Sequence, residues 1–396
     1  MHTGGNDAKL QIRESKSSPF EGKFIRNYLM MNLGYLLGEN PMEFIPSLEL
    51  SRMLYEEEIH PILEKKFPSL RVAAATLGMC SEVLGLDDAV SMDHEWGPRV
   101  TIFLSETDAP QYSDEIMQVL KESLPTMFHG YTMMWRKPGV DIHNTQKTIL
   151  YHVYPTTLRG TLKFYGGITT LRLKDVDWLR ISEQHLLEFT SGVVYRDDTG
   201  DLTKARQILK YYPDNVLRFL LLQDWNTIGS DLFPVGRIGS RGDLLGLRLQ
   251  TAKIVQSMMR IAFRVSRRYF HYKKWFGTLF NQLPLASNLE PLFLDLLVEQ
   301  NWKQVEEKVC QAVSILIQEQ NLLGISEKIN FQAKTVDDGR HHLKVDFWDI
   351  GRKTAGKINP QLKTLLDNQV FLFDERSLIL WNEEFGKWPL LLQKKA

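Results

Sequence analysis

The chain of 396 residues is poor in cysteine, with only Cys80 and Cys310. Two thiols can form neither a disulfide framework nor, by themselves, a zinc site. Such sparing use of cysteine fits a reducing environment, and we expect a cytoplasmic protein. The sequence also lacks any window that approaches the roughly 18 uninterrupted apolar residues of a membrane-spanning helix. The first 21 residues are polar and have no apolar core like that of a signal peptide.

Net charge is absent as well, because 48 Lys and Arg balance 48 Asp and Glu. A dedicated nucleic-acid binder normally carries an overall basic excess, so this balance disfavours nucleic acid as a partner. Disorder is disfavoured too, since hydrophobic residues make up 43% of the chain, enough to bury real cores. The length predicts two or three domains.

The order of predicted elements indicates an α+β protein. Strands and helices mix in the first half, whereas from about Leu171 onward the pattern is typical of helices. We therefore predict a small mixed-sheet domain, a helical-bundle domain and a short mixed C-terminal region. The expected divisions are a lead-in at 1–24, the mixed-sheet domain at 25–175, the helical domain at 176–325 and an α/β extension at 326–396.

The most informative stretch runs from Gly78 to Glu95. Residues 71–77 (RVAAATL) are typical of a buried strand, which leads into a turn of small residues and a short predicted helix at 81–84. Turns of this kind leave backbone N–H groups free, and free N–H groups suit anions such as phosphate. Gly78, Ser81 and Ser91 are therefore candidate nucleotide-binding residues.

Two carboxylates follow the turn. The segment 93–104 is predicted to form an interrupted strand, and because a strand alternates its faces with period two, Asp93 and Glu95 would point the same way. Paired carboxylates repel each other unless a cation lies between them, and Mg²⁺ favours such oxygen ligands. A two-metal site needs a third acid from a neighbouring strand. Asp141, in the predicted strand 139–143, is the best candidate, so Asp93, Glu95 and Asp141 are predicted catalytic residues and metal ligands.

These acids also allow plainer interpretations. Asp93 and Glu95 could cap a loop or pair with Arg99. Asp141 fits an ordinary solvated strand position about as well as a ligand position. The small residues around the acid pair favour the metal site over the loop.

A basic segment forms the third candidate feature. No acidic residue occurs between Asp243 and Glu290, and a helix is predicted over 244–280. Arg264, Arg267 and Lys274, together with Arg260 and His271, recur at intervals of three and four, so they would share one face of that helix. Like charges at such spacings repel, and either a triphosphate or acidic side chains such as Asp197, Asp198 and Asp201 could offset them. The third and least favoured interpretation of this segment is a nucleic-acid groove, in which Tyr269, Tyr272 and Trp275 would stack against bases.

At Ser81-x-x-x-Gly85 and Ser91-x-Asp93-x-Glu95 the chain resembles the DNA polymerase β-like nucleotidyltransferase superfamily, whose pattern is a Gly-Ser turn followed by an acid-x-acid pair. The run GMCSEVLGLDDAVSMDHEWGPR is more closely similar to a bacterial family of uncharacterised nucleotidyltransferase-like proteins. The resemblance implies a small mixed sheet followed by a helical substrate-binding domain. It also implies Mg²⁺-dependent transfer of a nucleoside monophosphate to a hydroxyl or phosphate acceptor. The departures are Cys80 where glycine normally precedes the serine, Glu95 where aspartate is commoner, and the inserted segment 96–99.

The leading hypothesis is accordingly an active nucleotidyltransferase that uses Mg²⁺ and a nucleoside triphosphate, ATP being favoured, with a small molecule favoured as acceptor. Two alternatives remain. One is a non-catalytic nucleotide-binding or regulatory module on the same scaffold, suggested by Cys80. The other is a protein-modifying enzyme that transfers AMP to a protein hydroxyl.

Overall fold

The computed structural model describes most of the chain, and every element below belongs to residues 46–396, the second of the two units into which the chain divides. The described residues are 44–93, 96–136, 149–336, 342–356 and 358–367.

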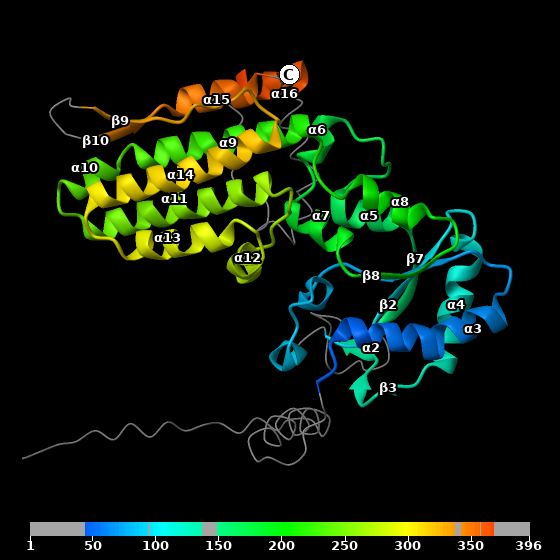
Figure 1. Cartoon of the computed structure of the whole chain (residues 1–396). Helices are drawn as coiled ribbons and strands as arrows, with labels where there is room; N and C mark the ends of the chain where they lie inside the picture. Colours follow the sequence, from blue (N-terminus) through cyan, green and yellow to red (C-terminus); the bar gives the residue numbers. More distant parts are fainter. Residues whose placement is uncertain (1–43, 94–95, 137–148, 337–341, 357, 368–396) are drawn as a thin grey trace, which may run out of the picture. The chain divides into compact units, whose positions relative to one another are not determined.

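A four-stranded mixed sheet holds the candidate turn (Figure 1). Its order is β7-β2-β1-β8, in which β1 pairs antiparallel with both β2 and β8, while β2 and β7 are parallel. The parallel pair requires a crossover connection, and helix α4 (Ala109–Ser123) lies within it. The strands are β1 (Ala73–Thr76), β2 (Val100–Leu104), β7 (Val153–Thr157) and β8 (Val193–Asp197).

Strands β1 and β2 are buried along their whole length because hydrophobic cores cover both faces of the sheet. Ala73, Ala75 and Phe103 face one core, which continues into the helical part of the chain. Ala74 and Ile102 face a second core. That second core is built with the helical run α2 (Ser47–Leu54), η1 (Tyr55–Ile59) and α3 (His60–Lys66), and with α4. The alternation is the period-two pattern of a strand, and small alanines let both layers approach β1 closely.

Strand β8 corrects one expectation. The sequence predicts helices from about Leu171 onward, yet β8 returns to the sheet and pairs with β1. The strand has only five residues and lies between Gly192 and Gly200, both at positive φ. So short a segment gives little alternation of apolar and polar residues from which a strand could be predicted. The helices around it are α5 (Leu158–Gly166), α6 (Asp175–Trp178), α7 (Glu183–Thr190) and α8 (Asp201–Ile208).

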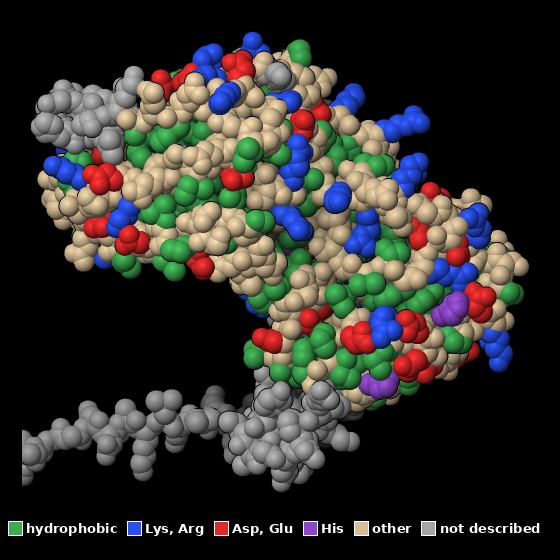
Figure 2. Space-filling view, viewed as in Figure 1, with side chains coloured by type: hydrophobic (Ala, Val, Ile, Leu, Met, Phe, Trp, Pro, Cys, Tyr) green, Lys and Arg blue, Asp and Glu red, His purple; other side chains and the backbone are tan. Residues whose placement is uncertain are grey.

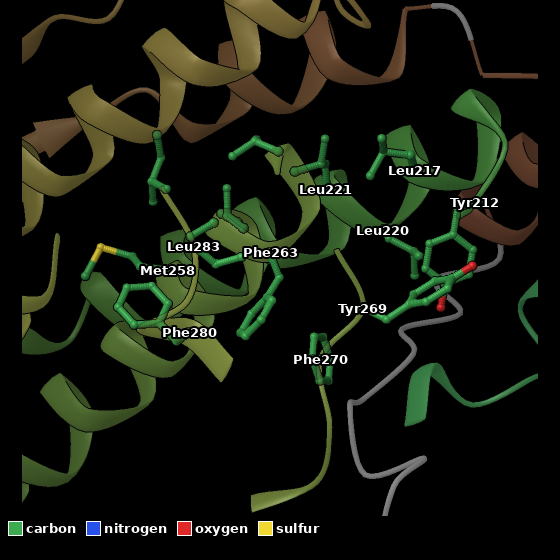
Figure 3. Close-up of a cluster of buried hydrophobic side chains, with 14 of the residues drawn as sticks. Tyr212, Leu217, Leu220, Leu221, Met258, Phe263, Tyr269, Phe270, Phe280 and Leu283 are labelled. Carbon is green, nitrogen blue, oxygen red and sulfur yellow. The ribbon is translucent and has the colours of Figure 1, made fainter. Parts of the chain in front are cut away.

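Helices α9, α11, α13 and α14 run side by side in Figure 1, and α11 contacts each of the other three. Their shared interior is filled by aliphatic and aromatic side chains, among them Met258, Phe263 and Phe280 (Figure 3). The helices are α9 (Asp214–Leu232), α10 (Val235–Gly239), α11 (Leu244–Val265), α12 (Lys273–Phe280), α13 (Ala286–Val298) and α14 (Trp302–Leu323).

The predicted helix over 244–280 is wrong in its length. Helix α11 ends at Val265, and α12 begins only at Lys273. Between them Arg267 has φ +48, a left-handed conformation that interrupts a right-handed helix. Arg267, His271 and Lys274 therefore do not continue the helical face that carries Arg260 and Arg264.

After α14 the described chain adds a hairpin and two helices, and α15 packs on α9. These elements are β9 (Ala333–Val336), β10 (His342–Val345), α15 (Phe347–Ala355) and α16 (Pro360–Asp367). Two further hairpins precede β7, namely β3 (Met127–Phe128) with β4 (Tyr131–Thr132), and β5 (Met134–Arg136) with β6 (Ile149–Tyr151).

The α+β expectation is confirmed at the level of a small mixed sheet accompanied by many helices. None of the helices in the described part of the chain is both long and apolar enough to cross a membrane. Basic and acidic side chains are interspersed over the face shown in Figure 2, in keeping with the balanced charge of the sequence.

Candidate functional site

The turn after β1 has the strand–turn–short helix form that the sequence predicts. Leu77 and Gly78 follow the strand, and the turn leads directly into the 3₁₀ helix η2 (Ser81–Leu84). Gly78 has φ +105, and a Cβ added there would lie 2.1 Å from the hydroxyl oxygen of Tyr165. Only glycine fits this position, because both the backbone conformation and the contact with Tyr165 exclude a side chain.

Cys80 adopts a backbone conformation that is essentially reserved for glycine, with φ 89 and ψ 160. A residue with a Cβ in this region costs of order 1–3 kcal/mol, and such strain concentrates at functional sites. Glycine is the residue that adopts such a backbone conformation without strain. In this chain the turn keeps the glycine-like backbone even though the residue is cysteine.

The backbone N–H groups of the turn differ in what they bind. The Gly78 N–H donates to the carbonyl oxygen of Glu188 at 3.0 Å, so this group is already used within the protein. The Met79 N–H faces the hydroxyl oxygen of Tyr165, whose pKa is raised by burial and lowered to a smaller extent by this N–H. By contrast, the Ser81 N–H meets no acceptor among the described residues. Ser81 is partly exposed, which leaves this donor within reach of a ligand. An accessible N–H donor beside a hydroxyl is suited to an anionic oxygen.

Arg99 supplies a fixed positive charge at the same turn. Its Nη2 donates to the Met79 carbonyl oxygen at 2.5 Å and lies 2.9 Å from Glu82 Oε1. Burial alone would lower the pKa of Arg99, but the Glu82 carboxylate and the nearby Cys80 thiol outweigh burial and raise it. The guanidinium therefore stays charged. The sequence suggests Arg99 as a partner for Asp93 or Glu95, and the structure shows it bound to Glu82.

Residues on either side of the acid pair are tied to the start of α2. Asp87 Oδ2 accepts hydrogen bonds from Ser47 N at 2.8 Å and from Trp96 Nε1 at 2.9 Å. Ser47 Oγ donates to the Gly97 carbonyl oxygen at 2.6 Å. The segment 96–99, which interrupts the expected hydrophobic run, thus anchors the chain between the acid pair and β2. Asp87 acts in this anchor through its hydrogen bonds to Ser47 and Trp96.

The strand predicted to carry Asp93 is not formed. Residues Ala89–Asp93 form the 3₁₀ helix η3, and β2 begins only at Val100. Asp88 explains the difference, because its Oδ1 accepts from the N–H groups of Val90 and Ser91, both at 3.0 Å. Such local side-chain bonds compete with sheet pairing. Asp93 therefore does not lie on a strand, and the prediction that it shares a strand face with Glu95 loses its basis.

Of the three predicted metal ligands, only Asp93 falls within the described residues. Asp93 ends η3, whereas Glu95 and Asp141 lie outside the described residues. Within the described ranges no group of three or more His, Cys, Asp or Glu side chains could hold a metal ion. The Mg²⁺ site thus stays a prediction from the sequence. Ser91 lies in η3, where its Oγ donates to Asp88 Oδ1 at 3.1 Å.

Buried acids partner the basic residues of α11. Arg264 Nη1 donates to Glu183 Oε2 at 3.2 Å, and Arg264 Nε donates to Asp224 Oδ2. Arg260 Nε donates to Asp224 Oδ1 at 3.0 Å. The side chains of Arg264, Glu183 and Asp224 are all buried. Acidic partners thus offset these charges, as one of the open alternatives expected, although the acids come from α7 and α9.

Beyond α11 the basic and aromatic residues are more accessible. Arg267 Nη2 donates to Asp214 Oδ1 at 2.7 Å, and the Arg267 side chain is 37% exposed. Lys274 is exposed in the first turn of α12, with its Nζ 4.7 Å from the centre of the Trp275 ring. Tyr269, suggested above as a stacking platform, is buried, and its ring packs against Tyr211 and Tyr212 (Figure 3 labels Tyr212 and Tyr269).

Comparison with known proteins gives limited similarities. Residues 178–276 match the model of a domain of unknown function, DUF4037. This region contains Glu183, Asp224 and Arg264, which form the buried ion-pair network. No curated protein matches the chain. One similar solved structure is that of a nucleotidyltransferase-like protein from Exiguobacterium sibiricum 255-15, at 10% identity and a TM-score of 0.30. The match covers 70% of this chain and 76% of that one. A likeness of this extent leaves the function to be argued from the residues of the site.

Proposed function

We propose that this protein is a Mg²⁺-dependent nucleotidyltransferase that moves a nucleoside monophosphate from a nucleoside triphosphate, in the first instance ATP, to a small-molecule acceptor. The observation that carries the proposal is the turn at 78–81. It combines glycine-like backbone at Gly78 and Cys80, an accessible N–H donor at Ser81, and the guanidinium of Arg99.

In this proposal the turn binds the phosphates of the nucleotide. The N–H group and the hydroxyl of Ser81 donate to phosphate oxygens. Arg99 contributes through its charge, since its Nη2 already binds the Met79 carbonyl oxygen and so fixes the turn in place. Charged groups held in position before the ligand arrives stabilise developing negative charge without further reorganisation.

The carboxylates of Asp93, Glu95 and Asp141 would hold Mg²⁺, because hard oxygen ligands shared with phosphate suit this ion. Bound Mg²⁺ would polarise the phosphoryl oxygens of the transferred group. Asp87 and Trp96, which lie on either side of Asp93 in the sequence, are hydrogen-bonded to each other, and Asp87 also binds the start of α2.

The proposal is tested by measuring pyrophosphate release from ATP and Mg²⁺ over a panel of hydroxyl- and phosphate-bearing acceptors. Loss of one metal ligand removes several kcal/mol of transition-state stabilisation, so Asp93→Asn should lower turnover by at least about 100-fold. Asp114→Asn is the matched control, because Asp114 is exposed on α4. Unchanged turnover in the Asp93→Asn protein would refute the assignment.

A second candidate is a nucleotide-binding module without catalysis on the same scaffold. The strained Cys80 favours it, because this backbone position carries a side chain where glycine would carry none. Calorimetry with ATP and Mg²⁺ beside the release assay separates the two candidates. Binding without release for any acceptor supports the module, and release supports the enzyme.

A further inference from the structure

A buried Glu–His pair contacts the phosphate-binding turn from behind. Glu188 of α7 is completely buried, and its backbone carbonyl oxygen accepts the Gly78 N–H. Its carboxylate oxygen Oε1 accepts from Gln184 Nε2 at 2.7 Å and lies 3.2 Å from Nε2 of His271. His271 belongs to the segment between α11 and α12. Glu188 therefore connects three parts of the chain: the turn through its backbone, α7 to which it belongs, and the segment before α12 through its side chain.

Stability alone explains this pair poorly. Glu188 Oε2 and His271 Nδ1 are buried, and neither has a hydrogen-bond partner among the described residues. A buried polar atom left without a partner costs about 1–3 kcal/mol. Replacing a buried ion pair with apolar side chains is often neutral or stabilising. A pair retained at such a cost beside a candidate site is more readily explained by what it positions.

The end of α7 holds the turn at a second point. The Gly192 N–H donates to the Val83 carbonyl oxygen at 2.9 Å, beyond the Gly78 contact. Arg206 Nη2 in turn donates to the carbonyl oxygens of Thr190, Ser191 and Gly192, at 2.5, 2.9 and 3.2 Å. Backbone hydrogen bonds therefore hold the turn and η2 at two points, and the Glu188–His271 pair joins α7 to the segment before α12.

Tyr272 follows His271 directly in the chain. Its ring is 4.9 Å from that of His271. Burial raises the pKa of the Tyr272 hydroxyl, and the Cys80 thiol and the Glu188 carboxylate raise it further, so this hydroxyl lies close to the turn. Lys273 and Lys274 follow at once and are exposed.

We propose that the Glu188–His271 pair is a positioning device that holds the phosphate-binding turn and places Tyr272 and Lys273 beside it, as the second wall of the nucleotide site. The positioning of the turn stands on the contacts alone. The identity of the ligand as a nucleoside triphosphate rests on the proposed function. Glu188 and His271 act through the turn and through Tyr272, without touching the ligand.

Cys80 provides a reporter that needs no knowledge of the substrate. Its thiol is partly exposed within the turn, whereas Cys310 is buried and burial raises its pKa to about 12. Because the thiolate is the reactive form, a disulfide reagent such as 5,5′-dithiobis(2-nitrobenzoate) should modify Cys80 in the folded protein and leave Cys310 unmodified. The modification rate reports on the exposure and electrostatics of the turn.

The variants are Glu188→Gln and His271→Gln, with Glu57→Gln as control. Glu57 also pairs with a histidine, His129 at 3.3 Å, but both side chains of that pair are exposed. If the pair holds the turn, both test variants loosen it and both speed modification of Cys80. A threefold to tenfold increase corresponds to about half to one unit of thiol pKa, or to a similar gain in access.

The two substitutions remove an acidic and a basic group, so comparing their effects separates a charge effect from a positioning effect. If the pair acted only through its charges, removing the carboxylate would speed thiol modification and removing the imidazole would not. Rates equal to those of Glu57→Gln, or acceleration in Glu188→Gln alone, would overturn the proposal. Gln184→Met, which removes only the third partner of the carboxylate, provides a milder variant in case either substitution unfolds the protein, and it should also speed modification.

Adding ATP and Mg²⁺ to the same assay separates this inference from the proposed function. If ATP and Mg²⁺ protect Cys80 in the wild-type protein and protect it less in the two variants, the result supports the positioning role and the nucleotide site together. Faster modification in the variants without protection by nucleotide supports the positioning of the turn and contradicts the nucleotide site. Protection that is equal in all proteins, with equal rates, supports the nucleotide site and overturns the positioning role.

Discussion

Cys80 offers the sharpest prediction, because its backbone conformation and its residue type conflict. With φ 89 and ψ 160, the position belongs to the region that is almost exclusive to glycine. The strain there is of order 1–3 kcal/mol for a residue with a Cβ. Glycine would remove this strain but would lose more conformational freedom on folding, at a cost of about 0.5–1 kcal/mol. The difference predicts that Cys80→Gly stabilises the protein by about 1 kcal/mol.

The measurement is urea unfolding of the wild-type, Cys80→Gly and Cys80→Ala proteins under reducing conditions. Alanine keeps the Cβ, and with it the strain, while removing the sulfur. The Gly-minus-Ala difference therefore isolates the backbone conformation from any contribution of the thiol. At ordinary helix or strand positions glycine is less stable than alanine by roughly 0.5–1 kcal/mol. That ordinary sign, found at position 80, would refute the strain argument.

Three further predictions follow from buried contacts. Gly78→Ala should destabilise the protein, and adding Tyr165→Phe should recover part of the loss in a double-mutant unfolding cycle, because the added Cβ meets the Tyr165 hydroxyl oxygen at 2.1 Å. Equal losses in the single and double variants would contradict that clash. Asp224→Asn should cost about 3–5 kcal/mol of unfolding free energy, since it removes the carboxylate that the buried Arg260 and Arg264 share, although Arg264 keeps Glu183. As a control, Asp295→Asn removes an exposed carboxylate and should cost less than about 1 kcal/mol of unfolding free energy. Equal costs for the Asp224 and Asp295 substitutions would argue against the buried network. Burial lowers the pKa of His152 to about 3, despite its hydrogen bond to the Pro98 carbonyl oxygen. As pH falls, His152 is therefore protonated in the unfolded chain before it is protonated in the folded protein. The stability linked to His152 is lost between about pH 6.5 and pH 3, by up to about 1.4 kcal/mol per pH unit. The difference in unfolding free energy between wild type and His152→Asn should narrow over that range, and a constant difference would contradict the assignment.

Local sequence was enough to predict the turn. Residues 71–77 are apolar and compact, and Gly78 with the small residues after it marks the end of the strand. Both the strand and the short helix at Ser81–Leu84 are present in the structure. The prediction succeeded because each part of the signal lies within a few residues of the structure that it specifies.

Features that depend on distant residues could not be predicted in this way. Arg99 binds Met79 and Glu82, and Glu188 meets His271 across 83 positions of the chain. No spacing rule connects such residues, because the fold alone brings them together. The contact between Glu188 and the turn was missed for this reason.

Other errors arose where one local signal outweighed another. The basic residues from Arg260 to Lys274 recur at helical intervals, but Arg267 adopts a left-handed conformation and ends that pattern. The period-two argument for Asp93 failed because the side-chain bonds of Asp88 form η3 where a strand was expected. In both cases periodicity was a true feature of the sequence, and a local backbone preference overrode it.

The phosphate-binding role of the turn is tested by a crystal structure of the protein with a non-hydrolysable ATP analogue and Mg²⁺. We expect phosphate oxygens within hydrogen-bond distance of the Ser81 N–H group, with Mg²⁺ bound by Asp93. A nucleotide bound elsewhere, with no phosphate oxygen at the turn, would contradict the central claim that this turn is a phosphate-binding site.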